Sequence, residues 1–306
     1  LNNHIGVPLT LLRLRPEHDL AVVEMGASHP GDIKELVEIA EPDYGIITNV
    51  GKAHLEGFGS FEGVIQTKGE LYDYLRQREN SIIFIHHDNP YLNNIAGGLK
   101  QIAYGNEDNL YINGRVTGNS PYLTFGWKAG KDGECHEVQT QLIGEYNFPN
   151  ALAAVTIGHF FDVAPEKIDR ALTDYTPQNN RSQLKKTADN TLIIDAYNAN
   201  PTSMMASIGN FKNMNAENKA LILGDMGELG KDSAEEHQKI VDYLEECGFE
   251  DVVLVGELFA AARHRYRTYP TAAELIEALK QQKPHGKTIL IKGSHYTKLE
   301  SVVGYL

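Results

Sequence analysis

The stretch from Tyr44 to Leu75 constrains the fold most, because its hydrophobic pattern changes twice. Residues 44–50 are apolar and rich in β-branched side chains, which predicts a buried parallel strand. Glycines at 51, 57 and 59 break this pattern and predict a loop. Ser60 is well placed to cap a helix, and apolar residues then recur at helical spacing up to Leu75. Ligands of open α/β sheets bind at the carboxyl ends of strands, which is where this loop lies.

Three polar residues of this strand-loop-helix unit are candidates for a site: Asn49, His54 and Lys68. A single histidine in a loop is usually a surface group, and a single lysine on a helix is usually solvated. Either residue alone would be interpreted as a solvated surface group. Their grouping with Asn49 in one unit favours a functional interpretation.

The rest of the chain alternates apolar strand patterns with amphipathic helix patterns, which predicts an α/β protein. Between residues 101 and 142, short alternating segments with many glycines predict a small antiparallel sheet appended to the first domain. The polar segment 175–183 contains Pro177 and marks a domain boundary. We therefore expect a first domain at residues 1–178 and a second at 179–306. Further strands are predicted at 20–26, 81–85, 191–195, 220–223, 252–255 and 288–291, and helices at 32–40, at 164–174 and in the apolar run that ends near 161.

Charge and cysteine usage narrow the function. The net charge of −13 argues against a general nucleic-acid binder. The 2 cysteines, Cys135 and Cys247, lie too far apart for a disulfide framework or a metal-binding motif, which fits a reducing cytosol. The sequence contains no apolar run of transmembrane length, and we expect no signal peptide. These features predict a cytoplasmic protein that neither binds nucleic acid nor inserts into a membrane.

The run from Thr48 to Ser60, Thr-Asn-Val-Gly-Lys-Ala-His-Leu-Glu-Gly-Phe-Gly-Ser, and the later Lys68-Gly-Glu resemble the central domain of the Mur ligases. Within that family the chain is most similar to the MurF branch. The resemblance implies that His54 binds magnesium and that Lys68 is carbamylated, so that both serve catalysis. Glu24, in Glu-Met-Gly, is similar to the family's Glu-x-Gly and would complete the magnesium site. Carbamate and carboxylate oxygens are ligands that magnesium prefers.

Other motifs resemble the family's nucleotide-binding residues. Gly144-Glu-Tyr-Asn-Phe-Pro-Asn-Ala is similar to a motif whose asparagines contact the adenine of ATP, which implies that role for Asn147 and Asn150. Helix capping is the ordinary alternative for asparagines in this position. Arg181 matches an arginine that contacts nucleotide phosphate, although Asn180 departs from the pattern before it. Asp195 opens Asp-Ala-Tyr-Asn-Ala-Asn-Pro, which is similar to a motif whose aspartate binds nucleotide.

The remaining matches concern the other substrates. Asn2 and Asn3 resemble residues that lie near the UDP-linked substrate. Asn198 and Asn200 belong to the motif that begins at Asp195, although Asn200 before Pro201 is also an ordinary helix start. Lys292, in Lys-Gly-Ser-His, is similar to a lysine that meets substrate, and its alternative is a solvated strand end.

The resemblance implies a partial central P-loop-type ATPase domain with a small antiparallel sheet, followed by a C-terminal Rossmann-like α/β domain. It implies an ATP- and Mg2+-dependent ligase that joins D-alanyl-D-alanine to UDP-N-acetylmuramoyl-tripeptide through an acyl phosphate. We expect a monomer. The family's Gly-x-x-Gly-Lys-Thr phosphate loop does not occur in the sequence. We therefore expect a fragment that lacks the N-terminal domain and is inactive by itself.

Two alternatives stay open. One is a sister ligase of the MurE or folylpolyglutamate synthase type, although the Asp-Asn-Pro-Arg of MurE-type chains does not occur here. The other is a non-catalytic binding module, which the missing phosphate loop favours. The coding sequence upstream of this chain separates the second alternative from an enzyme.

Overall fold

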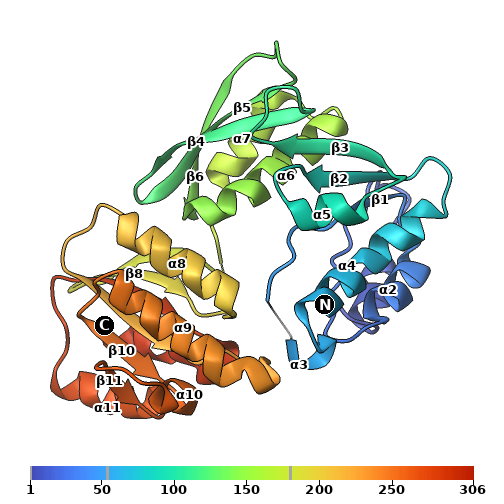
Figure 1. Cartoon of the computed structure of the whole chain (residues 1–306). Helices are drawn as coiled ribbons and strands as arrows, with labels where there is room; N and C mark the ends of the chain where they lie inside the picture. The colour runs from blue at the N-terminus through green and yellow to red at the C-terminus, as the bar shows by residue number, and fades with distance from the viewer. Residues whose placement is uncertain (1, 53–54, 179–180) are drawn as a thin grey trace. The chain divides into compact units, whose positions relative to one another are not determined.

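The computed structural model describes residues 2–52, 55–178 and 181–306, and these form two compact units (Figure 1). One unit consists of Leu1–Arg115, Trp127–Cys135 and Pro149–Pro165. The other consists of Val116–Gly126, His136–Phe148 and Glu166–Leu306. Each unit is described by itself below.

The first sheet has six strands in the order β1-β2-β3-β4-β5-β6, and β1, β2 and β3 pair in parallel. β3 also pairs in parallel with the start of β4. The antiparallel strands predicted between residues 101 and 142 are β4, β5 and β6, which continue this sheet beyond β3, and the short connections after β4 and β5 join antiparallel neighbours. The strands are β1 (Tyr44–Ile46), β2 (Ile82–His86), β3 (Lys100–Gly105), β4 (Ile112–Asn119), β5 (Tyr122–Ala129) and β6 (His136–Ile143).

Helices precede β1, separate β1, β2 and β3, and follow β6. Ser60 caps α4 because its Oγ accepts a hydrogen bond from the Gly63 amide at 3.1 Å, which satisfies a backbone donor of the first turn. The helices are α1 (Gly6–Leu11), α2 (Asp32–Ala40), α3 (Leu55–Phe58), α4 (Phe61–Arg76), α5 (Pro90–Ile95), the 3-10 turn η1 (Glu145–Asn147), α6 (Phe148–Phe160) and α7 (Pro165–Asp174).

Successive residues of β2 point to opposite faces of the sheet, and each face has its own cover. Ile83 and Ile85 pack in one apolar cluster with residues of α4 and α5, including the fully buried Tyr72 and Leu92. Phe84 faces the other way and contacts Phe160 of α6, with ring centroids 5.2 Å apart. The unit is therefore a helix-sheet-helix sandwich around β2.

The prediction of a buried strand at residues 20–26 is wrong. This segment has no regular secondary structure, and the side chains of Leu20 and Val22 are 49% and 84% exposed. An apolar run becomes a strand only where its backbone groups find a neighbouring strand. The Gly26 amide instead donates to the carbonyl of Asn2 at 2.7 Å. The strand predicted at residues 44–50 is also shorter, because β1 ends at Ile46.

The second sheet has the order β11-β10-β9-β12-β8-β7, and all its neighbouring strands are parallel except β7 and β8. The chain moves from β8 to β9, β10 and β11, then returns to insert β12 between β8 and β9. The carboxyl ends of β8, β12 and β9 thereby meet at one edge. The strands are β7 (Gln183–Lys186), β8 (Thr191–Asp195), β9 (Lys219–Gly224), β10 (Val252–Val255), β11 (Arg267–Tyr269) and β12 (Thr288–Lys292).

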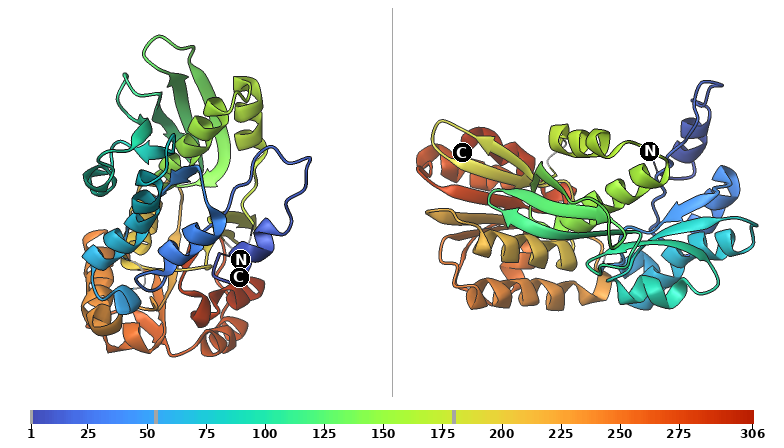
Figure 2. Two further views of the ribbon diagram at one scale, coloured as in Figure 1. Left: turned by 90° about the vertical axis from the view of Figure 1, so that its right-hand side faces the viewer. Right: turned by 90° about the horizontal axis from the view of Figure 1, so that it is seen from above.

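Helices cover both faces of this sheet. Alternate residues of β8 and β12, such as Ile194 and Ile291, pack against apolar residues of α11 and η4. The helices α8 and α9 lie side by side on the opposite face (Figures 1 and 2). The predicted Rossmann-like arrangement is confirmed. The elements are α8 (Pro201–Asn213), η2 (Gly230–Asp232), α9 (Ser233–Glu246), α10 (Glu257–Ala261), α11 (Ala272–Gln281), η3 (His295–Thr297) and η4 (Leu299–Tyr305).

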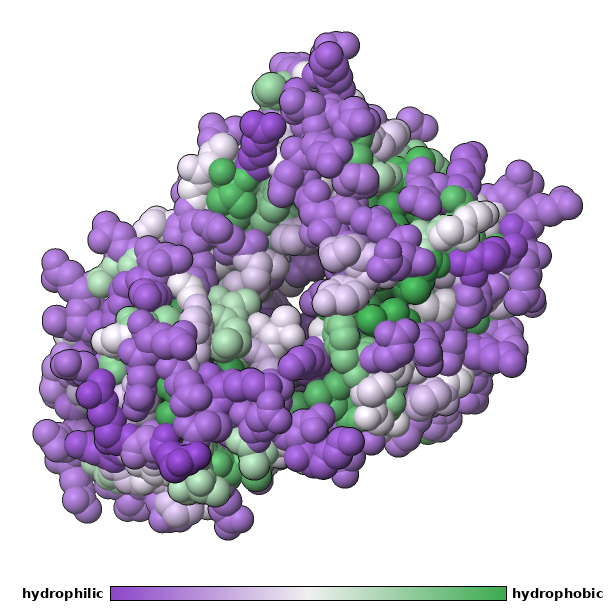
Figure 3. Space-filling model, in the orientation of Figure 1, coloured by the Kyte–Doolittle hydropathy of each residue, from purple (hydrophilic) through white to green (hydrophobic). Residues whose placement is uncertain are grey.

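The face drawn in Figure 3 is mostly hydrophilic, with hydrophobic residues scattered across it. Among the described residues, none of the helices combines the length and the apolar character that crossing a membrane would need.

Candidate functional site

The carboxyl edge of the second sheet joins two of the residues that the sequence singled out. Asp195 ends β8 and Lys292 ends β12, and the two are register partners in neighbouring strands. Lys292 Nζ lies 2.6 Å from Asp195 Oδ2, and the lysine side chain is only 2% exposed. The sequence placed each residue at a strand end, but the solvated lysine that we weighed as an alternative is wrong. The two residues form an ion pair in which the lysine is buried and the aspartate side chain is 14% exposed.

Further donors surround this pair. Ser207 of α8 donates its hydroxyl to Asp195 Oδ2 at 3.2 Å, and the Ser182 amide donates to Oδ1 at 3.3 Å. Lys292 donates a second hydrogen bond to the backbone carbonyl of Asn198 at 3.3 Å. The carboxylate is therefore held by a lysine, a hydroxyl and an amide, and the lysine also fixes the loop that follows β8.

The two asparagines of that loop make local contacts. Asn198 Oδ1 accepts from the Ala199 amide at 2.8 Å. Asn200 Oδ1 accepts from the Ser203 amide at 2.9 Å, and the Asn200 amide donates to Ser203 Oγ at 3.2 Å, which forms a capping box at the start of α8. Asn200 thus orients the helix that carries Ser207. Its side chain supports the site from the helix start.

The predicted adenine-binding asparagines occupy different local structures. Asn147 is the last residue of η1, and its Nδ2 donates to the Ile143 carbonyl at 2.8 Å. Asn150 lies in the first turn of α6 and is exposed. Asn147 therefore lies just before α6, which begins at Phe148, and Asn150 lies within it.

Lys68 is the best-defined candidate in the first unit. It lies on α4, is half-buried, and donates from Nζ to the backbone carbonyl of Asn49 at 2.7 Å. Burial lowers the pKa of the Lys68 amine because the charged form loses hydration. The predicted partner His54 lies outside the described residues. The carbonyl of Asn49 therefore orients Lys68 toward the end of the strand pattern at 44–50.

Glu24, the third predicted magnesium ligand, is exposed and accepts a hydrogen bond from Asn2 Nδ2 at 3.1 Å. Gly26 keeps this contact possible, because a Cβ there would come within 2.6 Å of the Asn2 side chain. Asn3 Oδ1 accepts from the amides of Ile5 and Gly6 at 3.2 and 2.9 Å, in the turn that leads into α1. Within residues 2–52, 55–178 and 181–306, no group of three or more His, Cys, Asp or Glu side chains is placed to hold a metal ion.

Asn2 and Asn3 also line an open pocket of about 460 Å3 in the first unit. Most of its lining residues are polar or charged. Asp32 fixes the loop at residues 28–29 by accepting from the amides of Ser28 and His29 at 2.9 Å each. The predicted substrate residues Asn2 and Asn3 therefore do lie at a concave surface. Its lining residues are Asn2, Asn3, His4, Gly26, Ala27, Ser28, His29, Asp32, Glu35 and Leu36.

Glu70 is a positioning residue that the sequence did not reveal. It lies two residues after Lys68 on α4, and its carboxylate accepts from the amides of Gly31 and Lys34 at 2.7 and 2.8 Å. These donors belong to the amino end of α2, where a negative charge is favourable. Glu70 thus ties the helix of Lys68 to the loop that lines the pocket. The Lys-Gly-Glu motif contained the only sequence signal for it.

A second buried carboxylate, Asp225, follows β9. It accepts from the amides of Leu258 and Phe259 at the start of α10, at 3.0 and 2.9 Å. His237 of α9 is fully buried beside it, with Nε2 3.8 Å from Asp225 Oδ1. The Met226 amide donates to His237 Nε2 at 3.0 Å, and Nδ1 lies 2.7 Å from the Ser233 carbonyl. Because a carbonyl only accepts, Nδ1 carries the proton and the imidazole is neutral.

This geometry predicts that acid loosens the loop after β9. Burial lowers the pKa of His237 below its ordinary value of 6.5. The unfolded chain therefore binds more protons below that pH, so stability is complete above it and falls as pH drops through the folded-state pKa. We expect the protection of residues 225–230 against amide exchange to be complete above about pH 6.5 and to fall at lower pH.

The loss of protection should reach about tenfold per pH unit, which is the limit for one proton. His237→Gln should remove this pH dependence, whereas His4→Gln, at an exposed position, should retain it. An unchanged pH dependence in His237→Gln would assign the effect to another group.

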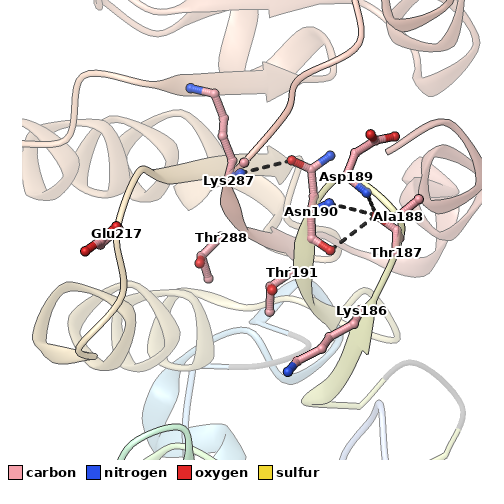
Figure 4. Close-up of a pocket in the computed structure, with 10 residues that line it drawn as sticks. Lys186, Thr187, Ala188, Asp189, Asn190, Thr191, Glu217, Lys287 and Thr288 are labelled. Carbon is pink, nitrogen blue, oxygen red and sulfur yellow. Dashed lines mark hydrogen bonds between the residues drawn. The ribbon is translucent and has the colours of Figure 1, made fainter.

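Another pocket, of about 370 Å3, lies at the opposite end of the second sheet, where Thr191 and Thr288 begin their strands (Figure 4). Its buried Asn190 is already satisfied, because Nδ2 donates to the carbonyls of Pro284 and Leu306 and Oδ1 accepts from the Lys287 amide. Ligands of parallel sheets bind at the carboxyl edge, so this hollow is no candidate for the active site.

Comparison with known proteins agrees with this geometry. The Mur ligase middle domain matches residues 1–158, and the Mur ligase glutamate ligase domain matches residues 180–295. The UDP-N-acetylmuramoyl-tripeptide–D-alanyl-D-alanine ligase of Bacillus subtilis is 32% identical over 320 residues, which cover 99% of this chain and 67% of that protein. The protein of the same name from Escherichia coli is 34% identical over 316 residues, covering 99% and 68%.

Solved structures of MurF ligases are also similar to this chain. The crystal structure of MurF from Acinetobacter baumannii has a TM-score of 0.85 at 29% identity, covering 99% of this chain and 68% of that one. MurF ligase from Thermotoga maritima, in complex with ADP, has a TM-score of 0.86, covering 100% and 71%, and at 23% identity it supports the fold alone. The chain thus spans about two thirds of the length of these relatives. With both domain matches and relatives above 30% identity, the chain belongs to the Mur ligase family.

Proposed function

We propose that this chain is the middle and C-terminal part of an ATP-dependent ligase that joins D-alanyl-D-alanine to UDP-N-acetylmuramoyl-tripeptide. The relatives from B. subtilis and E. coli carry that name. The observation that carries the proposal is the buried Asp195–Lys292 pair, which lies at the ligand-binding edge of the second sheet within the matching motif.

The proposed reaction forms an amide in two transfers. A carboxylate oxygen of the tripeptide attacks the γ-phosphorus of ATP, and ADP leaves with the electron pair of the broken P–O bond. The amine of the dipeptide then attacks the acyl carbon, phosphate leaves, and the amine loses a proton. Activation is needed because a carboxylate is a poor electrophile. When bound, Mg2+ supplies positive charge next to the phosphate oxygens.

Lys68 has the chemistry that its proposed carbamate requires. Carbamylation consumes an uncharged amine, and burial lowers the pKa of this amine so that more of it is uncharged. The carbamate would add oxygen donors, which suit magnesium. We propose Glu24, His54 and the carbamate of Lys68 as the ligands of the magnesium ion.

The other residues would bind the remaining ligands. We propose that Asn147, Asn150, Arg181 and Asp195 serve ATP. Asn2 and Asn3 would bind the UDP-linked substrate. Asn198, Asn200 and Lys292 would bind the acceptor, D-alanyl-D-alanine. In this arrangement Lys292 acts as a pair with Asp195, since the two are buried together. We further propose a monomer in the cytosol, with a domain boundary between residues 178 and 179.

The test is phosphate release by the full-length protein that contains this chain, with ATP, magnesium and UDP-N-acetylmuramoyl-tripeptide. We expect release to require D-alanyl-D-alanine, and L-alanyl-L-alanine to serve as the matched inactive acceptor. This 306-residue chain alone should release none. Release that follows a single amino acid rather than the dipeptide would indicate a sister ligase, and no release from a folded full-length protein would favour a binding module.

A further inference from the structure

Arg181 is held in place from two sides, although it lies on the surface. Its guanidinium carbon is 4.0 Å from the centroid of the Tyr197 ring, so the cation stacks on the aromatic face. The guanidinium N–H groups all lie in its plane. Stacking therefore occupies the face of the group and leaves its edge free to donate two parallel hydrogen bonds to a phosphate.

The backbone next to Arg181 is also fixed. Ser182 is buried and has φ of 47°, a left-handed conformation that residues other than glycine adopt at a cost. Two contacts hold it there. Its amide donates to Asp195 Oδ1 at 3.3 Å, and its hydroxyl lies 2.9 Å from the Tyr146 hydroxyl. Because Arg181 precedes Ser182 directly, these contacts set the direction in which the arginine leaves the chain.

Tyr146 is built into this position. A Cβ at Gly144 would come within 2.3 Å of its ring, so the glycine of the motif is needed for the tyrosine to fold back. Burial, together with the nearby charge of Asp195, raises the pKa of the Tyr146 hydroxyl to about 12. The hydroxyl therefore stays protonated at neutral pH and keeps its hydrogen bond with Ser182.

We propose that Tyr146 and Tyr197 are positioning residues for Arg181: Tyr197 fixes the plane of the guanidinium, and Tyr146 fixes the backbone beside it through Ser182. The inference rests on the proposed function only in taking a nucleotide phosphate as the ligand of Arg181. Neither tyrosine is required to touch the nucleotide. The two together would give the arginine its binding geometry before the nucleotide arrives, which lowers the entropy cost of binding.

The experiment measures the dissociation constant of ADP by calorimetry, with the full-length protein. Tyr197→Leu should raise it about threefold, the range of an exposed cation–π contact, and Tyr197→Phe should leave it within about twofold because the ring remains. Tyr146→Phe should raise it by about threefold to fivefold, since the Ser182 hydroxyl loses its buried partner. The exposed Tyr175→Leu is the matched control and should change nothing.

The decisive measurement is a double-mutant cycle. In an Arg181→Ala background, neither Tyr197→Leu nor Tyr146→Phe should weaken ADP binding further. Full additive losses in that background would overturn the inference, because the tyrosines would then act independently of the arginine. Equal losses in Tyr197→Phe and Tyr197→Leu would also overturn it. Melting temperatures identify any variant that is unfolded. If Arg181→Ala is unfolded, Arg181→Lys, which keeps the charge but not the planar stack, takes its place in the cycle.

Failure of the proposed function has a different signature. ADP binding is measured without the acceptor, so the cycle does not depend on which amide the protein makes. A protein that binds ADP with the predicted coupling, but releases phosphate only with another acceptor, would retain this inference and lose the substrate assignment.

Discussion

Lys68→Ala in the full-length protein is expected to lower the rate of dipeptide-dependent phosphate release by about a hundredfold to a thousandfold, with little effect on folding. Losses of this size follow when a group that holds charge at a phosphoryl-transfer site is removed. The structural reason lies in the contacts of Lys68. It is half-buried, and within the part of the chain that the structure describes it donates to a backbone carbonyl, that of Asn49, rather than to another side chain.

The measurement is the steady-state rate at saturating substrates, with the melting temperature as a check on folding. Lys100→Ala, at an exposed position on β3, is the matched control and should keep the wild-type rate. Depleting dissolved carbon dioxide should slow the wild type and leave Lys68→Ala unchanged, because a carbamate forms from carbon dioxide and an uncharged amine. Turnover at the wild-type rate by Lys68→Ala would remove Lys68 from the site.

The second large effect concerns stability. Lys292→Met is expected to lower the free energy of unfolding by about 3–5 kcal/mol, because it leaves the Asp195 carboxylate, which is only 14% exposed, without its cation. Ser207 and the Ser182 amide would still donate to that carboxylate, but neither carries a charge. Denaturant unfolding of the full chain, followed by amide exchange in β8 and β12, would measure the loss.

The matched control is Lys280→Met, which breaks an ion pair whose lysine is 47% exposed, and it should cost less than about 1 kcal/mol. The double variant Asp195→Leu/Lys292→Met should recover much of the stability, since neither charge remains to be buried. If Lys292→Met cost no more than Lys280→Met, the pair would not be a buried charge pair in solution.

Predictions from local pattern succeeded where the signal is local. The glycines after Val50 and the cap at Ser60 predicted the start of α4, and the structure shows the Ser60 cap. The β-branched runs predicted β8, β9, β10 and β12, because strands of a parallel sheet are buried on both faces and are apolar along their whole length.

Predictions failed where the outcome depends on a neighbour that is distant in sequence. Residues 20–26 have a strand pattern but no strand beside them. The alternation after residue 100 predicted antiparallel strands, but it gave no sign that β3 joins them to the parallel strands by pairing in parallel with β2 and with β4. A period of two reveals an extended strand with two different faces, and it carries no information about which strand lies next to it.

The site divides in the same way. The sequence by itself determined the family, the positions of β8, β9, β10 and β12, and the placement of Asp195 and Lys292 at strand ends, because these are properties of contiguous motifs. Only the tertiary structure decided that this lysine is buried against this aspartate and that Glu70 holds the end of α2. Insertion of β12 between β8 and β9 brings residues 195 and 292 into register. Such pairings arise from strand order and packing, which no single stretch of sequence contains.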